Sequence, residues 1–383
     1  MEKITNYFFH HDSNPHGHRG NHKFPEFLID PILLTKIPCE NGVLDICLLG
    51  KDKVGICSYL KKELNIFETS GFQHDALPSK GNPQYLSRSE GSIMYTELEG
   101  NTVSKTEYPP SQNRDDQDVE MVSEKGIIKE PEKRRDNTTS ATASDKDSEA
   151  LKKQSKKNAK KKREKKMEVD EENKNTSKIE RKINDGATER NRKTSDILIT
   201  EKWIPRGIHC TKSGGAIVCL WNGLRGERSQ GKVVKYSKDG EVLKEYETHH
   251  HNPLYARPMY VTENHNGDIC VSDWERKSVI VVNQSGTKRF EYERHKMQND
   301  EEQEFDPRGL CTDSLKNILI ADYWCHRLHV LDENGHFIRF LIYQNARGPT
   351  GICIDENNLL YVCELGGKSI NVIKYLKETI KPE

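Results

Sequence analysis

A short strand-turn-strand unit recurs along the chain with a fixed internal spacing. In each copy a segment with the pattern Pro-x-Gly, or its equivalent, leads to an apolar strand that begins ten residues after the x position. The intervals run from Arg206 to Ala216, from Met259 to Ile269, from Arg308 to Ile318 and from Thr350 to Leu360. One such unit cannot bury its apolar faces alone, so the repeat predicts that neighbouring units pack against one another.

Each unit continues beyond its second strand. Apolar runs predict a third strand in all four units, at 232–236, 278–283, 327–332 and 369–375. Gly-containing turns then lead to a fourth strand in the first three units, at 242–246, 288–292 and 337–341. Four strands in about 42 to 52 residues is the size of one β-propeller blade.

The last unit has only three strands before the chain ends, which directs attention to the N-terminus. Residues 31–37 (PILLTKI) form an isolated apolar strand with no partner nearby in the sequence. Ring closure needs such a strand, because it completes the sheet of the last blade and removes an open edge. Residues 44–68 supply three strands of a further blade. Residues 82–104 supply three strands of another, whose fourth strand we place at 197–202.

These segments predict an all-β, six-bladed propeller closed by an N-terminal strand, with about 43 residues in each blade. A long charged insertion interrupts blade two. The predicted leader is 1–27, and the closing strand with blade one and the first part of blade two is 28–107. The insertion is 108–194, and the remainder of blade two with blades three to six is 195–378.

The insertion has the composition of a disordered segment. From 109 to 194 it holds 24 Lys or Arg and 19 Asp or Glu, and it contains no Phe, Trp, Tyr or Cys. It therefore cannot bury enough apolar surface to fold alone. Within it lies a basic run that is either a solvated charge run, a nuclear import signal or an RNA contact. Its members are Lys152, Lys153, Lys156, Lys157, Lys160, Lys161, Lys162, Arg163, Lys165 and Lys166.

Cysteine and histidine patterns argue against bound metal. The chain has ten cysteines but no CxxC pair, so zinc domains of the RING and B-box type are not expected, and reduced buried thiols are. The five histidines from His10 to His22 read as part of a disordered polar leader rather than a metal-binding tract. We expect no cofactor and no metal.

Charge and hydropathy favour a cytoplasmic protein. Basic and acidic residues balance at 60 each, so net charge gives no argument for nucleic acid or a membrane. No apolar stretch is long enough to span a membrane, and the first residues lack the apolar core of a signal peptide. Nuclear import through the basic run at 152–166 is the alternative location.

The assembled repeat resembles the NHL repeat. Residues 260–273 (YVTENHNGDICVSD), followed by the strand at 279–283, look especially like the C-terminal propeller of tripartite motif (TRIM-NHL) proteins in an invertebrate, mollusc-like branch. Unlike the full family architecture, this chain has no RING, B-box or long coiled coil. The resemblance implies a binding domain in the ubiquitin pathway, with protein clients or structured RNA as partners. The missing RING implies no intrinsic ubiquitin-ligase activity.

Acidic residues end four of the six second strands. The six positions are Ser58, Glu97, Leu220, Asp273, Asp322 and Glu364. A carboxylate at such a turn accepts backbone N–H groups, which is the structural interpretation we prefer. The alternative is a metal in the central channel, as in propeller lactonases, and it would make the protein a hydrolase.

Equivalent loops of the repeat share one face, and this face is predicted to be aromatic and basic. Such residues are typical of protein-binding hot spots, and they also stack bases and pair with phosphates. Some of these rings could instead wedge neighbouring blades together. The predicted rim is Arg206, Trp221, Arg257, Trp274, Arg276, Lys277, Arg308, Tyr323, Trp324, His326, Arg327 and Arg347.

The sequence therefore predicts a noncatalytic platform that recognises a partner through one face of the propeller. The alternative is an RNA-binding propeller assisted by the basic run, and a propeller hydrolase is the third hypothesis. Expected partners are a protein client, structured RNA or both, with a separate RING ligase and no membrane.

Overall fold

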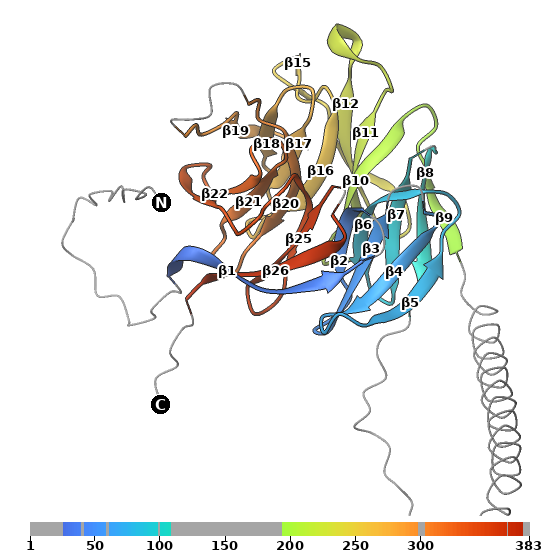
Figure 1. Cartoon of the computed structure of the whole chain (residues 1–383). Coiled ribbons are helices and arrows are strands. Elements are labelled where there is room, and N and C mark those ends of the chain that lie inside the picture. Colours follow the sequence, from blue (N-terminus) through green and yellow to red (C-terminus); the bar gives the residue numbers. More distant parts are fainter. Residues whose placement is uncertain are drawn as a thin grey trace, which may run out of the picture. The chain divides into compact units, whose positions relative to one another are not determined.

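The computed structural model describes residues 26–39, 42–58, 61–98, 100–108, 194–297, 303–365 and 367–377. Within them the chain forms six four-stranded antiparallel sheets and no α-helix, which confirms the predicted all-β, six-bladed propeller (Figure 1). Blade one consists of β2 (Val43–Leu48), β3 (Lys53–Ser58), β4 (Glu63–Glu68) and β5 (Gln73–Pro78). Blade two consists of β6 (Pro83–Ser89), β7 (Ser92–Glu97), β8 (Thr102–Glu107) and β9 (Thr194–Ile199). Blade three consists of β10 (Ile204–Cys210), β11 (Ala216–Trp221), β12 (Gly231–Tyr236) and β13 (Val242–Tyr246).

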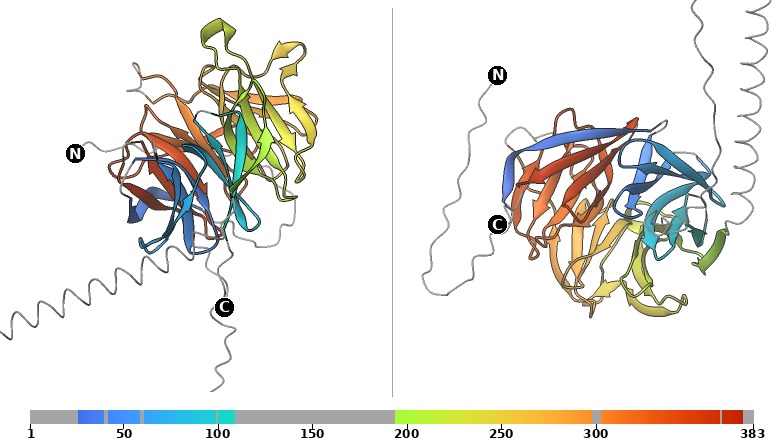
Figure 2. Two further views of the ribbon diagram at one scale, coloured as in Figure 1. Left: turned by 90° about the vertical axis from the view of Figure 1, so that its right-hand side faces the viewer. Right: turned by 90° about the horizontal axis from the view of Figure 1, so that it is seen from below.

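Blades four to six complete the ring seen end-on in the right-hand view of Figure 2. The first strand of every blade contacts the first strands of both neighbouring blades, so six first strands surround the central axis. Blade four consists of β16 (Pro258–Glu263), β17 (Ile269–Asp273), β18 (Ser278–Val282) and β19 (Lys288–Tyr292). Blade five consists of β20 (Pro307–Thr312), β21 (Ile318–Asp322), β22 (Arg327–Leu331) and β23 (Phe337–Leu341). Blade six consists of β24 (Pro349–Ile354), β25 (Leu359–Glu364), β26 (Ser369–Leu376) and β1 (Phe27–Pro38).

The fixed ten-residue spacing has a local cause in the turn between the first and second strands. Asn264 Oδ1 accepts the N–H of Asp268 at 2.9 Å, and Asp313 Oδ1 accepts the N–H of Asn317 at 2.8 Å. The same bond recurs in blade six, where Asp355 is the acceptor. A short polar side chain that bonds the backbone four residues later sets the length of the turn.

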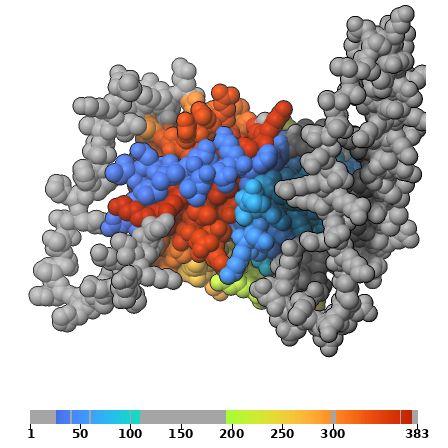
Figure 3. Space-filling view, turned by 60° about the horizontal axis from the view of Figure 1, so that its bottom comes forward, coloured from blue at the N-terminus to red at the C-terminus, as the bar shows by residue number. Residues whose placement is uncertain are grey.

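The closing strand is confirmed. β1 pairs antiparallel with β26 and forms the outer edge of blade six, where it crosses the surface in Figure 3. It is longer than the predicted 31–37 segment, because it begins at Phe27. Arg339 of β23 donates through Nη1 to the Leu28 carbonyl and through Nη2 to the Ile29 carbonyl, the latter at 2.7 Å. The guanidinium group thus binds the first residues of β1 to blade five.

The fourth strand of blade two starts earlier than predicted. The sequence placed it at 197–202, whereas β9 spans Thr194–Ile199. A turn follows at once, in which the Trp203 N–H donates to the Thr200 carbonyl at 3.0 Å and Glu201 has φ of 53°. This turn ends the strand before residue 200.

Three elements were not predicted. They are β5, the fourth strand of blade one; the short 3-10 helix η2 (Gly226–Arg228); and a two-stranded hairpin between blades three and four, made of β14 (Thr248–His249) and β15 (Asn252–Pro253). Most of the predicted leader and most of the predicted insertion, including the basic run, lie outside the described residues. No helix in the described part of the chain is long and apolar enough to cross a membrane.

The thiols behave as predicted. All ten cysteines are free, seven are buried and the other three are partly buried. Seven of them pack in or against apolar clusters that lie between neighbouring blades, such as the cluster in which Cys219 of blade three meets Val261 and Val271 of blade four. Each blade therefore buries its two faces against the next blades, as a repeat of this kind requires.

Candidate functional site

The propeller has two chemically different ends. The antiparallel register pairs the start of each first strand with the end of its second strand, for example Ile204 with Trp221 and Pro307 with Asp322. We call this end the arginine face. The turns between first and second strands, such as residues 211–215 and 264–268, form the opposite face.

Three arginines from consecutive blades gather at the arginine face. The guanidinium carbons of Arg206 and Arg257 lie 5.2 and 4.3 Å from the ring centre of Trp221. Arg257 also lies 4.6 Å from the ring of Trp274, so it is held between two indoles. Arg308 lies 5.3 Å from the ring of Tyr323. Such cation–π contacts each contribute about 0.5 to 2 kcal/mol, depending on burial.

Polar contacts fix the first and third of these side chains. Arg206 is only 7% exposed and donates through Nη1 to Gln84 Oε1 at 2.7 Å. Arg308 donates through Nη2 to Asp306 Oδ2 at 2.9 Å. The nearby positive charge of Arg206 and, above all, burial lower the pKa of Arg257. The site therefore concentrates positive charge in a partly desolvated place.

The acidic ends of the second strands position this array. Asp273 is fully buried, and its carboxylate accepts the N–H of Ala256 at 2.7 Å and the N–H of Arg257 at 3.0 Å. Asp322 and Glu364 likewise accept backbone N–H groups. The predicted structural role of these carboxylates is confirmed for these three residues.

The other predicted rim residues divide into covered and exposed ones. Lys277 lies 4.5 Å from the ring of Trp274, and Arg276 bonds the Pro253 carbonyl through Nη2. Arg327 is 3% exposed and lies 4.1 Å from the ring of Phe340, so it does not reach the surface of the face. The exposed ones are Arg276, Trp324, which is 50% exposed, His326 and Arg347.

A tyrosine pair that the sequence did not point to forms the floor of the arginine face. The hydroxyl of Tyr260 in blade four donates to the Leu44 carbonyl of blade one at 3.4 Å, so the side chain crosses the channel. Tyr85 of blade two packs edge-on against it, with ring centres 4.9 Å apart. The signal was available, because both tyrosines occupy the place that Gly207 takes in the Pro-x-Gly pattern.

The glycine at that place explains why the tyrosines can converge. A Cβ on Gly207 would lie 2.6 Å from the Met259 carbonyl oxygen and 2.6 Å from the Tyr260 Cα. The missing side chain therefore lets the first strand of blade four approach closely enough to aim Tyr260 into the channel.

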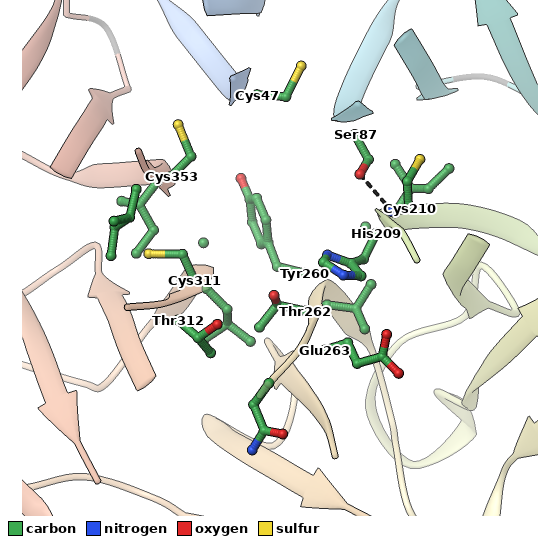
Figure 4. A pocket seen from close by; sticks show the side chains of 18 of the residues that line it. Cys47, Ser87, His209, Cys210, Tyr260, Thr262, Glu263, Cys311, Thr312 and Cys353 are labelled. Carbon is green, nitrogen blue, oxygen red and sulfur yellow. Dashed lines mark hydrogen bonds between the residues drawn. The ribbon is translucent and has the colours of Figure 1, made fainter. Parts of the chain in front are cut away.

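Below Tyr260 the channel widens into a cavity of about 710 Å³ that opens on the opposite face (Figure 4). Equivalent positions of the six first strands line its wall. They are Cys47, Ser87, His209, Thr262, Cys311 and Cys353. Burial raises the pKa of the Cys47 and Cys353 thiols and lowers the pKa of His209 to about 4. At neutral pH these side chains are uncharged.

The cavity has few side chains that could serve in acid-base or metal chemistry. Its one buried acid, Asp45, has its pKa raised to about 7 by burial, and its Oδ2 accepts the Leu86 N–H at 2.9 Å. No group of three His, Cys, Asp or Glu side chains able to hold a metal ion occurs among the described residues. The six wall positions are uncharged, whereas Arg88, Lys212 and Glu263 bring charged groups to other parts of the cavity lining.

The charged insertion leaves the propeller far from the arginines. β8 starts at the arginine face and ends at Glu107. β9 begins beside that end of β8, because Thr106 pairs with Thr194. Residues 107 and 194, at which the propeller strands meet the insertion, therefore lie at the opposite face.

Solved structures share this fold at low sequence identity. A streptogramin B lyase is 13% identical with a TM-score of 0.50, covering 93% of this chain and 89% of its own. A candidate gluconolactonase is 9% identical with a TM-score of 0.54, covering 91% and 93%. A structural-genomics protein of unknown function from Bacteroides thetaiotaomicron is 12% identical with a TM-score of 0.52, covering 91% and 72%. At these identities the likeness concerns the fold alone. No protein-family model and no curated protein matches the chain.

Proposed function

We propose that the protein is a noncatalytic binding platform that captures a protein partner on its arginine face, in the manner of a tripartite-motif-like recognition module. The observation that carries this proposal is the array of Arg206, Arg257 and Arg308 among aromatic rings. Arginine and aromatic side chains in partly desolvated places are typical of the residues that dominate protein interfaces.

Exposed apolar side chains surround the array. Leu224, Trp324 and Leu365 are 44%, 50% and 43% exposed, and each lies in a turn after a second strand, at the arginine face. Apolar residues around a charged centre are typical of a protein-binding surface. The closed ring holds their turns at fixed spacing, so a partner would order few loops on binding.

RNA is the alternative partner, and the state of the rings favours protein over RNA. Base stacking requires exposed aromatic faces. Trp221 is 5% exposed, and Arg257 lies between Trp221 and Trp274. Among the predicted rim tryptophans, Trp324 alone is half exposed. Protein binding should change little with moderate salt, whereas RNA binding should weaken steeply as salt rises.

Hydrolase activity is the third hypothesis. The cavity lining offers His209 as a neutral imidazole and Asp45 as its buried acid. A noncatalytic role is the simpler proposal for such a cavity. A separate RING ligase would then act on whatever the platform captures.

Site-directed photo-crosslinking in cells tests the proposed face. One copy of the protein carries a photo-crosslinking amino acid at Trp324, and a matched copy carries it at Lys212, an exposed residue of the opposite face. We expect a discrete protein adduct from position 324 that disappears with Arg257→Glu. Adducts only from position 212, or adducts made of RNA, would contradict the proposal.

A further inference from the structure

We infer that the arginine face binds the carboxylate of an acidic peptide, seated among Arg206, Arg257 and Arg308 above the Tyr85–Tyr260 pair. This inference rests on the proposed function and names the chemistry of its partner. It concerns a peptide with acidic side chains next to apolar ones.

Arg206 and Arg257 share the ring of Trp221, and together with Arg308 they act on one buried group. The positive charges of Arg206, Arg308 and Arg257 all act on the Tyr85 hydroxyl and lower its pKa, although burial dominates and raises that pKa to about 12. Arg308 acts in the same way on Tyr260. The tyrosine pair is thus the common floor beneath three guanidinium groups that belong to blades three, four and five.

Positive charge exceeds negative charge at this point. Asp306 is the carboxylate bonded to Arg308, Glu275 is the acidic group whose charge acts on Arg257, and Asp45 is the acid whose charge acts on Tyr85 and Tyr260. Glu275 Oε1 accepts the Gly226 N–H at 3.2 Å. Arg225 adds a further positive charge near Arg257. No ion pair of Arg206 or Arg257 occurs within the described part of the chain, so their charges are available to an incoming anion.

Hydrogen-bond donors are also unused. The Nε atoms of Arg206, Arg257 and Arg308 are buried and have no partner. Arg206 itself is more than nine-tenths buried, and the Arg257 guanidinium makes no hydrogen bond to any described residue. Buried donors without partners are costly, and a carboxylate offers the planar pair of oxygens that a guanidinium fork fits.

The surroundings favour a peptide over a free anion. Leu224, Trp324 and Leu365 offer exposed apolar surface on the turns of blades three, five and six, which flank the arginines. A peptide with Leu or Phe beside its acidic residue would bury these side chains while its carboxylate meets the guanidinium groups. An inorganic ion would use only the charge.

Selection from a random peptide library tests the inference without assuming a sequence. The full chain is immobilised, and 12-residue peptides displayed on phage are selected on it, with an Arg257→Gln, Arg308→Gln variant as the matched comparison. We expect selected peptides to be enriched in Asp or Glu flanked by apolar residues, and we expect the enrichment to be lost on the variant. Peptides without acidic enrichment, equal enrichment on the variant, or no selected peptide would overturn the inference.

The selected peptide then allows a quantitative test by fluorescence anisotropy. Replacing its acidic residues with Asn or Gln should weaken binding at least tenfold, as should Arg257→Gln in the protein. Arg257→Lys keeps the charge but loses the planar fork, so it should weaken binding by a smaller factor, and Lys212→Gln should leave binding unchanged. Thermal melts of each variant separate lost binding from lost folding.

The outcome distinguishes this inference from the proposed function. Non-acidic selected peptides that still bind in an Arg257-dependent way would overturn the acidic ligand and leave the protein-binding face in place. If oligouridine competes with the acidic peptide and binds more tightly than it, the face belongs to RNA, and both the inference and the proposed function fail.

Discussion

The two sides of Tyr260 carry opposite chemistry although the same six first strands build both. On one side Arg206 and Arg308, each directly after the proline near the start of its strand, bring positive charge to the arginine face. On the other side six equivalent positions further along these strands line a cavity with thiols, hydroxyls and a neutral imidazole. The difference teaches that a repeat fixes where side chains point, while each end of the ring acquires its own ligand chemistry.

The largest expected effect concerns Asp45, the acid at the boundary between the two sides. Its pKa of about 7 exceeds the value of about 3.9 for an unfolded chain, so the folded protein holds this proton over a wider pH range. Stability from this group is full below pH 4 and is lost as pH rises toward 7. The loss is about 4 kcal/mol at 1.36 kcal/mol per pKa unit.

Urea unfolding of the wild type and Asp45→Asn between pH 4 and 7.5 measures this effect. The free energy of unfolding of the wild type should fall relative to that of the variant across this range, since Asn can keep the bond from the Leu86 N–H without titrating. Parallel pH profiles for the two proteins would show that Asp45 ionises normally in the folded state.

The second prediction concerns Tyr260, the side chain that separates the arginine face from the cavity. Tyr260→Ala should lower the free energy of unfolding by about 3 kcal/mol, because it empties the centre of the ring between blades. Tyr260→Phe is the matched control, and it should cost about 1 kcal/mol, the value of the bond to the Leu44 carbonyl. Equal losses in the two variants would mean that the ring of Tyr260 contributes no packing.

The third prediction reverses one of the three charges of the arginine face and changes no residue of the cavity. Arg257→Glu should weaken binding of the acidic peptide at least 100-fold, which is about 2.7 kcal/mol, because it replaces attraction with repulsion. Lys212→Glu at the cavity mouth is the control and should change affinity less than threefold. Anisotropy titrations measure both, and similar losses in the two variants would end the distinction between the faces.

The smallest effect sharpens the roles of two cations on one ring. Lys277 and Arg257 both contact Trp274, but Lys277 also pairs with exposed Glu304 at 3.6 Å. Lys277→Ala should cost less than about 1 kcal/mol in thermal or urea unfolding, as for other partly exposed contacts. It should leave peptide affinity nearly unchanged. A loss of affinity as large as that of Arg257→Glu would extend the binding site to this blade edge.

The fold was predictable because its signals are local and repeated. The ten-residue spacing comes from a turn that Asn264 or Asp313 closes through its own side chain, and the isolated PILLTKI segment announces the closing strand. β5 escaped prediction because Leu77 is its only buried residue, so it lacks an apolar alternation. An edge strand of this kind pairs through its backbone and leaves little trace in the sequence.

The site was predictable only in part. Arg206 and Arg308 share a repeat position, so their common face could be inferred from spacing. Tyr85 and Tyr260 were missed because their contact depends on two blades that face each other across the channel, which no local pattern records. Arg327 was placed on the rim because it follows a turn, but its strand position directs it onto Phe340.

Ring closure by β1 has a consequence for biosynthesis. β1 is translated before every other strand of the propeller, and its partner β26 follows more than 300 residues later in the chain. At about 5 to 20 residues per second, the closing strand waits on the ribosome for tens of seconds with its apolar edge unpaired. The sixth blade can form only after β26 has left the exit tunnel. A nascent chain stalled before that point would be a natural client for cotranslational chaperones.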